Sequence, residues 1–210
     1  MRTRIFASLL GLVCVSAMPL PGLARDQGHP FQLRSSTFNN NTFLPLSAIY
    51  NFIPPNGTTN VCSIDGSLGG DKSPALSWTR PRRNTRSFVV ILYDETAAFT
   101  HWGMYNISPD ARGLPQNAGV ADSQFGKQIH NDVSGGAQYD GPCPPQGVAP
   151  VVHRYVFTVY ALRTLLDLPS SENFPANAAT LYQALVQAGE DGDILESASI
   201  TGLYSSTPSQ

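Results

Sequence analysis

The chain has 210 residues, of which 41% are hydrophobic and 13% are charged. That length is enough for one well-cored domain and short for two. The formal net charge is −2, which argues against a nucleic-acid-binding protein, because such proteins carry a basic surface. With 18 Gly and 17 Pro, we expect a loop-rich, β-rich domain rather than a helical bundle or a disordered chain.

Residues 1–24 have the features of a secretory signal peptide. Arg2 and Arg4 form a basic start, residues 5–17 are apolar, and small residues surround Ala24. We expect cleavage near Ala24, which leaves residues 25–210 as a single periplasmic or secreted domain. The apolar run is too short for a comfortable membrane span, so no transmembrane segment is expected in the mature chain.

The cysteine count carries a second prediction. Cys14 lies in the expected leader, so Cys62 and Cys143 alone remain in the mature chain. In an exported protein two remaining cysteines usually pair. Such a disulfide would close a loop of about 80 residues and stabilise the fold by about 4 kcal/mol through loop entropy. The alternative is two buried free thiols.

Alternating apolar residues, bounded by turn residues, predict strands along most of the chain. Residues 87–94 are apolar on both faces, which indicates a strand in the middle of a layered domain. A Gly-rich, irregular segment at 111–139 is expected to cover the sheet edge or a pocket. The expected strands are residues 31–38, 43–50, 73–78, 87–94, 100–107, 152–161 and 199–204.

Two further patterns complete the expected fold. Residues 177–188 have apolar side chains at helical spacing, and residues 193–198 are expected to form a second short helix. The order of many strands followed by helices predicts an all-β or α+β domain with an antiparallel sheet. Four arginines surround Pro81, and a solvated turn is the expected structure there, with Arg80, Arg82 and Arg83 exposed.

The stretch from Tyr139 to Leu162 carries the strongest functional signal. Its first part, GPCPPQG, has the Pro and Gly content of a stiff loop, because neither residue suits a helix or a central strand. In the strand that follows, period two places His153 and Tyr155 on one face. Polar groups at a strand end beside a rigid loop are typical of a small-molecule site. The alternative is a buried strand with a hydrogen-bonded core histidine.

GPCPPQG followed by HRYVFTVYAL resembles the phosphatidylethanolamine-binding protein family, also called Raf-kinase-inhibitor-like proteins. SPALSW and SFVVILYDETAAFTHWGMYNIS match in the same order, so the resemblance covers about residues 31–204. It implies a mainly β fold, a sandwich of two antiparallel sheets with short C-terminal helices. It also places the family's anion-binding pocket on Asp94, His101, Gly141, Pro142, His153 and Tyr155.

The sequence departs from the family pattern after Asp94. The family commonly has Asp-Pro-Asp-Ala-Pro, whereas this chain has Asp-Glu-Thr-Ala-Ala. The connection to His101 is also shorter than usual. We therefore expect a more open pocket rim and a different ligand.

The resemblance implies a non-enzymatic protein that binds a small anion or phospholipid headgroup without a cofactor or metal, and that can regulate a partner protein. Two alternatives remain open. A hydrolase could use the Asp and His residues, although the chain has no Gly-x-Ser-x-Gly motif. A metal site could use Asp94, His101 and His153, since two His and one carboxylate bind iron or zinc.

Overall fold

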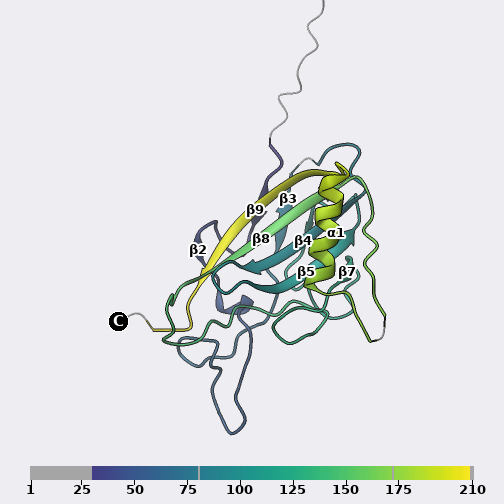
Figure 1. Ribbon diagram of the computed structural model, residues 1–210. Coiled ribbons are helices and arrows are strands. Elements are labelled where there is room, and N and C mark those ends of the chain that lie inside the picture. Colours follow the sequence, from purple (N-terminus) through teal and green to yellow (C-terminus); the bar gives the residue numbers. More distant parts are fainter. Residues whose placement is uncertain (1–29, 80, 172, 209–210) are drawn as a thin grey trace, which may run out of the picture.

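The computed structural model describes residues 30–79, 81–171 and 173–208. The expected signal peptide, residues 1–24, and Arg80 lie outside this part of the chain. Figure 1 shows a layered arrangement in which long strands cross the molecule side by side and helix α1 lies over one face of them. In the described residues no helix has the length and apolar character needed to cross a membrane.

Two sheets make up the sandwich. The smaller sheet has the order β1-β3-β6 and the larger has the order β2-β9-β8-β4-β5-β7. Every neighbouring pair is antiparallel except β2 and β9, which are parallel. The bounds are β1 Leu33–Ser35, β2 Thr42–Phe43, β3 Leu76–Trp78, β4 Ser87–Asp94, β5 Phe99–Ile107, β6 Gly113–Leu114, β7 Lys127–Gln128, β8 His153–Leu162 and β9 Ile194–Tyr204. The predicted mainly β, two-sheet fold is confirmed.

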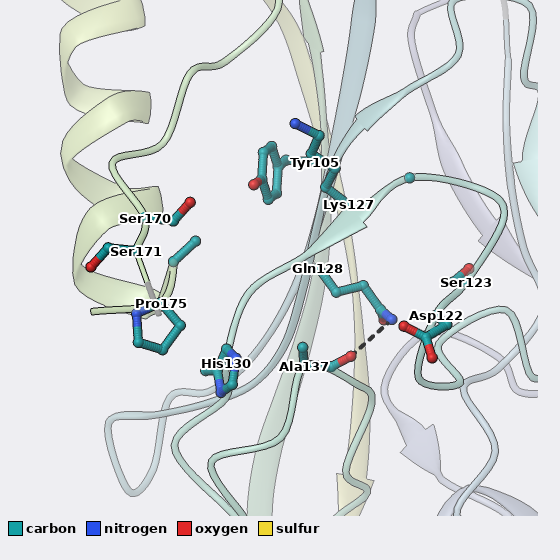
Figure 2. Close-up of a pocket in the computed structure, with 12 residues that line it drawn as sticks. Tyr105, Asp122, Ser123, Lys127, Gln128, His130, Ala137, Ser170, Ser171 and Pro175 are labelled. Carbon is teal, nitrogen blue, oxygen red and sulfur yellow. Dashed lines mark hydrogen bonds between the residues drawn. The ribbon is translucent and has the colours of Figure 1, made fainter. Parts of the chain in front are cut away.

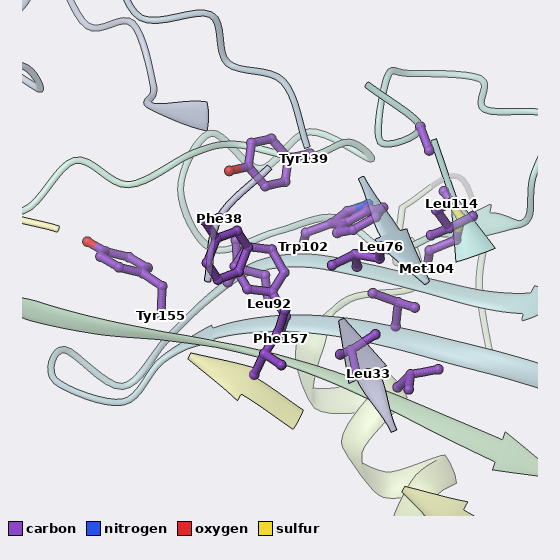
Figure 3. Packing of buried hydrophobic residues seen from close by; sticks show 14 of the residues in the cluster. Leu33, Phe38, Leu76, Leu92, Trp102, Met104, Leu114, Tyr139, Tyr155 and Phe157 are labelled. Atoms are coloured by element: carbon purple, nitrogen blue, oxygen red, sulfur yellow. The ribbon is translucent and has the colours of Figure 1, made fainter. Parts of the chain in front are cut away.

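The core lies between the two sheets. Large side chains from β4, β5 and β8 pack there against Leu33, Leu76 and Leu114 of the smaller sheet (Figure 3). Trp102, Tyr155 and Phe157 have no exposed surface, and burying one such side chain stabilises the fold by about 2–3 kcal/mol. His153 and Tyr155 share one face of β8, as predicted, and this face is the buried inner one.

Helix α1, Ala178–Glu190, covers part of the outer face of the larger sheet, where Leu181 and Leu185 are buried. Asn177 caps its start, because its side chain accepts from the Thr180 N–H while the Thr180 hydroxyl accepts from the Asn177 N–H. Gly192, with φ of 72°, ends it. The N–H of Asp193 then donates to the Ala188 carbonyl, a Schellman arrangement.

Two expected elements are wrong. Residues 193–198 are not a helix, because Ile194–Tyr204 pairs along its length with β8 as strand β9. Ladder hydrogen bonds and a buried neighbour override the weak helical pattern of this short segment. Residues 43–50 are not one extended piece, because β2 ends at Phe43 and a 3-10 helix, η1, forms at Leu46–Ala48.

Strict period two along β5 predicts His101, Gly103, Tyr105 and Ile107 on one face, but this prediction is wrong because the strand contains two irregularities. Leu92 pairs with Trp102 and Tyr93 pairs with Thr100, which leaves His101 as an extra residue opposite β4. Such a bulge re-aims side chains. His101 therefore packs against Tyr155 on the inner face. Gly103 instead faces Leu181 of α1 on the outer face, although period two assigned both residues to one side.

Candidate functional site

A cavity of about 200 Å³ lies where β4 ends and β5 and β8 begin. The predicted residues Asp94, His101, His153 and Tyr155 all line it. Each is buried, with exposed fractions between 0% and 6%. Ionisable and polar groups are rarely buried to this extent unless they are paired or used by a ligand. The sequence therefore located the residues that the fold brings together.

Asp94 and His153 form a buried pair across two adjacent strands. The Nδ1 atom of His153 lies 2.7 Å from Oδ2 of Asp94. The other carboxylate oxygen of Asp94 accepts from the backbone N–H groups of Thr96 and Ala97 at 2.8 and 3.1 Å. These bonds fix the carboxylate in the tight turn that replaces the family's longer loop. Because Nδ1 of His153 donates to Asp94, Nε2 is the nitrogen left for a ligand.

His101 is held in the same way by a different partner. Its Nδ1 atom lies 2.9 Å from the carbonyl oxygen of Asp140 and 3.1 Å from that of Gly141. A carbonyl oxygen only accepts, so Nδ1 carries the proton and Nε2 is again the nitrogen without a protein partner. Burial lowers the pKa of His101 below its ordinary value, with the nearby carbonyls and Asp94 opposing that shift. The ring is therefore neutral near pH 7.

Tyr155 lies beside both imidazoles. Its ring centroid is 5.2 Å from that of His101, edge to face, and 6.3 Å from that of His153, stacked. The Tyr155 hydroxyl is buried and makes no hydrogen bond within the described part of the chain. Burial, followed by the Asp94 carboxylate, raises the pKa of Tyr155, so the hydroxyl keeps its proton as a donor. A buried hydroxyl without a partner costs about 1–3 kcal/mol unless a ligand satisfies it.

Gly141 and Pro142 stand behind the cavity rather than in its lining. The Gly141 N–H donates to Asp71 at 2.8 Å, and its carbonyl faces His101. A Cβ at Gly141 would lie 2.1 Å from the Ala48 carbonyl oxygen, so only glycine fits this close approach. The Pro142 carbonyl accepts from the Tyr50 N–H at 3.2 Å. Both residues position His101 and the loop.

The rest of the lining was found only in part by sequence reasoning. Cys143, Pro144 and Pro145 belong to the rigid loop expected beside the site, whereas Ala97, Phe99 and Val133 were missed because they lie where the sequence gives no periodic signal. Val133 belongs to the 111–139 segment, which was expected to cover the sheet edge or a pocket. The additional lining residues are Ala97, Phe99, Val133, Cys143, Pro144 and Pro145.

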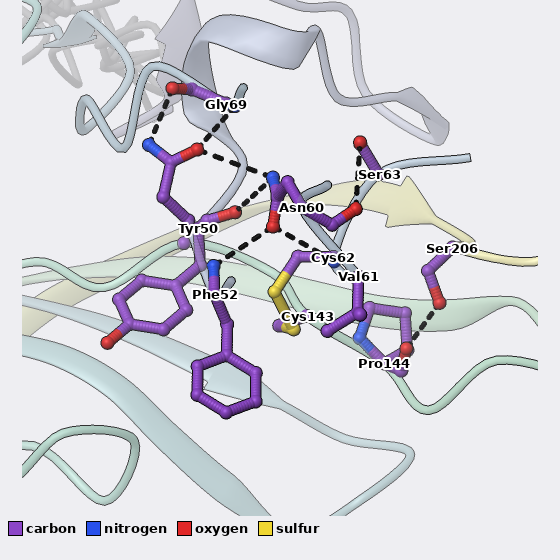
Figure 4. Close-up of a disulfide and its surroundings, with 12 residues drawn as sticks. Tyr50, Phe52, Asn60, Val61, Cys62, Ser63, Gly69, Cys143, Pro144 and Ser206 are labelled. Atoms are coloured by element: carbon purple, nitrogen blue, oxygen red, sulfur yellow. Dashed lines mark hydrogen bonds between the residues drawn. A yellow bond between two sulfur atoms is a disulfide. The ribbon is translucent and has the colours of Figure 1, made fainter. Parts of the chain in front are cut away.

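Cys62 and Cys143 form the predicted disulfide, with Cα atoms 4.4 Å apart (Figure 4). The loop around Cys62 is held by the Asn60 side chain, which accepts from the N–H groups of Phe52 and Cys62 and donates to the Tyr50 carbonyl. The Ser206 hydroxyl donates to the Pro144 carbonyl on the other side. The disulfide therefore anchors one wall of the cavity.

Two carboxylates form a second row behind the site. Asp140 has no exposed surface and accepts from the side chains of Asn131, Ser134 and Gln138. Burial raises the pKa of Asp71 to about 6, against the opposing hydrogen bond from Gly141, and Asp140 adds to the increase. A negative charge on these carboxylates favours a positive charge on the nearby His101 imidazole.

Other hollows lack this convergence of buried polar groups. A cavity of about 450 Å³ beside β7 is lined by Tyr105, Lys127, Gln128 and His130 among others (Figure 2). The Gln128 amide is already used by the carbonyls of Val120 and Ala137 and by the Trp102 indole. Among the described residues no three His, Cys, Asp or Glu side chains are grouped so that they could hold a metal ion.

Comparison with known proteins identifies the class. Residues 34–205 match the family described as Phosphatidylethanolamine-binding protein. The chain is 38% identical over 141 residues to the UPF0098 protein of Methanothermobacter thermautotrophicus, covering 65% of this chain and 84% of that one. It is 34% identical over 176 residues to the UPF0098 protein PH1269 of Pyrococcus horikoshii, covering 81% of this chain and 74% of that one.

A solved structure gives the same answer. Escherichia coli YbcL, titled a new member of the mammalian PEBP family, superposes with a TM-score of 0.65 at 28% identity. The match covers 84% of this chain and 99% of YbcL. The chain therefore belongs to the phosphatidylethanolamine-binding protein family.

Proposed function

We propose that this chain is an exported, non-enzymatic binding protein whose inner cavity captures a small anion or the phospho-headgroup of a lipid. One observation carries the proposal. Two imidazoles with occupied Nδ1 atoms and a buried hydroxyl without a partner line the same cavity. Nε2 of each imidazole becomes a donor when its ring takes up a second proton, and with the Tyr155 hydroxyl these groups suit the oxygens of a phosphate-like group.

Charge at the site supports the same ligand. A phosphate oxygen at Nε2 of an imidazole favours the protonated ring, and the Asp94 carboxylate, 2.7 Å from Nδ1 of His153, holds that ring in position. Asp94 can also accept from an ammonium group, which a zwitterionic headgroup provides. The name of the family, phosphatidylethanolamine-binding, agrees with this chemistry.

The lining supports binding rather than catalysis. It contains no Ser, Thr or Lys, and its one sulfur, that of Cys143, is in the disulfide. The Ser, Thr, Lys and free Cys nucleophiles common in covalent catalysis are thus absent from the lining, and the raised pKa of its one hydroxyl, that of Tyr155, keeps that group protonated. The proposal of export rests on the leader-like residues 1–24 and on a disulfide, which persists in oxidising compartments.

Calorimetry with phosphate, phosphoethanolamine and choline phosphate tests the proposal. We expect His153→Ala and His101→Ala each to weaken binding by about 1.5–3 kcal/mol, the usual worth of a hydrogen bond to a charged group. The matched control is Arg82→Ala with Arg83→Ala, because both arginines are cationic, exposed as predicted and distant in sequence from the cavity lining. That double variant should bind as the parent does.

Three outcomes would contradict the proposal. Unchanged affinity in both histidine variants would make these residues structural. Loss of phosphate binding in the Arg82→Ala, Arg83→Ala double variant would place the anion site at these arginines instead of the cavity. Stoichiometric iron or zinc in the purified protein would favour the metal alternative, since Asp94, His101 and His153 would then be its ligands.

A further inference from the structure

The outer face of the larger sheet carries a hollow of about 400 Å³ on the opposite side from the anion cavity. Three tyrosines line it, Tyr93, Tyr160 and Tyr182. In Figure 1, α1 lies over only part of the sheet and leaves much of β8 uncovered. We call this hollow the tyrosine bowl; its lining is completed by Ile91, Glu95, Val156 and Thr158.

Strand pairing builds the floor of the tyrosine bowl. Ile91 of β4 lies opposite Thr158 of β8, and Tyr93 lies opposite Val156. Tyr160 follows on the same face of β8, about 7 Å beyond Thr158 along the strand. The third ring, Tyr182, comes from α1 above the sheet. Three separate elements therefore each supply one aromatic ring.

Two of the three rings stand nearly perpendicular to each other. The Tyr93 and Tyr182 centroids are 6.3 Å apart with an interplanar angle of 80°. The Tyr182 hydroxyl lies 3.4 Å from the Thr100 hydroxyl. Tyrosine rings that line a hollow can attract cations through the ring quadrupole, and alkylated ammonium groups are the usual ligands.

The charges at the rim favour the same ligand. Glu95 lines the bowl and is about half exposed. Asp132 accepts from the Thr100 N–H and adds slightly to the raised pKa of Tyr182, whose main cause is burial. Arg154 lies 3.3 Å from Glu95 in an exposed pair. Such pairs contribute little and rearrange easily.

We propose that the tyrosine bowl binds a small organic cation with an alkylated ammonium group. An inorganic metal ion does not fit, because the lining offers one carboxylate and is otherwise aromatic and aliphatic. An anion does not fit either, since the lining contains no Lys, Arg or His. The site is independent of the anion cavity, because the two open on opposite faces of one sheet.

Two probes of nearly equal shape test this proposal on the full mature chain. Choline and 3,3-dimethylbutan-1-ol differ in that one has a positive nitrogen where the other has carbon. We expect choline to bind about tenfold more tightly, since a desolvated cation–π contact is worth that much. NMR chemical shifts should place the largest changes on the rings of Tyr93, Tyr160 and Tyr182.

Two variants of Tyr182 distinguish the contribution of the aromatic ring to choline binding from the contribution of side-chain packing. Tyr182→Phe keeps the π face and should retain choline affinity within about twofold, whereas Tyr182→Leu should lower it about fivefold or more. Both should bind phosphate as the parent does, and thermal unfolding checks that both are folded. Chemical-shift changes that choline causes on His153 rather than on the tyrosines would overturn the proposal. Equal affinity for the two probes, no choline binding, or equal losses in Phe and Leu variants would also overturn it.

Discussion

Strands β4 and β8 present two different hollows on their two faces. Inward they place Asp94, His153 and Tyr155 in a nearly buried polar cavity. Outward the neighbouring residues Tyr93, Val156 and Thr158 belong to an open, half-buried tyrosine bowl. Because side chains alternate along a strand, a shift of one residue changes the chemistry from buried donors to aromatic faces.

The comparison also shows what each hollow costs the fold. The inner cavity requires a buried hydrogen-bonded Asp94–His153 pair, a hydroxyl without a partner among the described residues, and a second row of carboxylates, Asp71 and Asp140. Groups of this kind destabilise a fold unless they are paired or bind a ligand. The outer bowl is lined by tyrosines whose rings pack on the sheet and α1. Its construction therefore adds to the core.

The largest expected effect concerns the disulfide, which belongs to the inner cavity alone. Changing Cys62→Ser together with Cys143→Ser opens a loop with a sequence separation of 81. We expect the free energy of unfolding to fall by about 4 kcal/mol from loop entropy. Urea unfolding of parent and variant measures this. Phosphate affinity should fall more than choline affinity, because Cys143 lines the inner cavity and neither cysteine lines the bowl.

Tyr155→Phe separates ligand binding from stability at the inner cavity. The hydroxyl has no described hydrogen-bond partner, so its removal should raise the free energy of unfolding by about 1 kcal/mol. Phosphate affinity should instead fall by about 1.5–3 kcal/mol, since a donor to a charged oxygen is lost. Urea unfolding and calorimetry on the same sample measure both. A variant that loses stability and keeps its affinity would show that the hydroxyl is structural.

The smallest expected effect on stability comes from Asp71, one of the two carboxylates behind the inner cavity. The folded pKa of Asp71 is raised to about 6 from 3.8, so the folded protein keeps a proton that the unfolded chain loses. Asp71's stabilising contribution is therefore present below pH 3.8 and is lost as pH rises to about 6. Asp71→Asn should raise stability at pH 7 by about 1 kcal/mol, allowing for partial exposure.

Asn suits this position because Asp71 has φ of 47°, a conformation that Asn tolerates. Its amide oxygen can also still accept from the Gly141 N–H. Urea unfolding at several pH values between 4 and 7 measures the difference between parent and variant. A difference that stays constant across this range would show that Asp71 does not titrate as described.

Period two within β8 predicted correctly which residues share a face, because this strand is regular at His153 and Tyr155. The same rule failed in β5, where a bulge at His101 turns that side chain to the inner face. Bulges leave no periodic signal, so the family resemblance rather than the pattern placed His101 in the site. Phe99 was missed because β5 begins one residue before the expected strand 100–107, and Val133 was missed because it belongs to an irregular loop.

The tyrosine bowl was predictable in part. Strand phase places Tyr160 on the outer face and Tyr93 on one side of β4. The position of Tyr182 depends on how α1 docks, and the helical pattern of residues 177–188 specifies a buried stripe but no crossing position. Tertiary docking therefore decides whether three rings meet, and no local signal in the sequence records it.

The central claim is that Nε2 of His101 and of His153 faces a bound anion. Long-range ¹⁵N–¹H NMR of the imidazoles between pH 5 and 8 tests it, with sulfate as the probe because its charge is constant there. Without sulfate, His101 should be the neutral Nδ1–H tautomer at pH 7 and gain its second proton below about pH 6.5, since burial lowers its pKa. Sulfate should raise that midpoint and shift both Nε2 resonances. Identical imidazole titrations with and without saturating sulfate would contradict the claim.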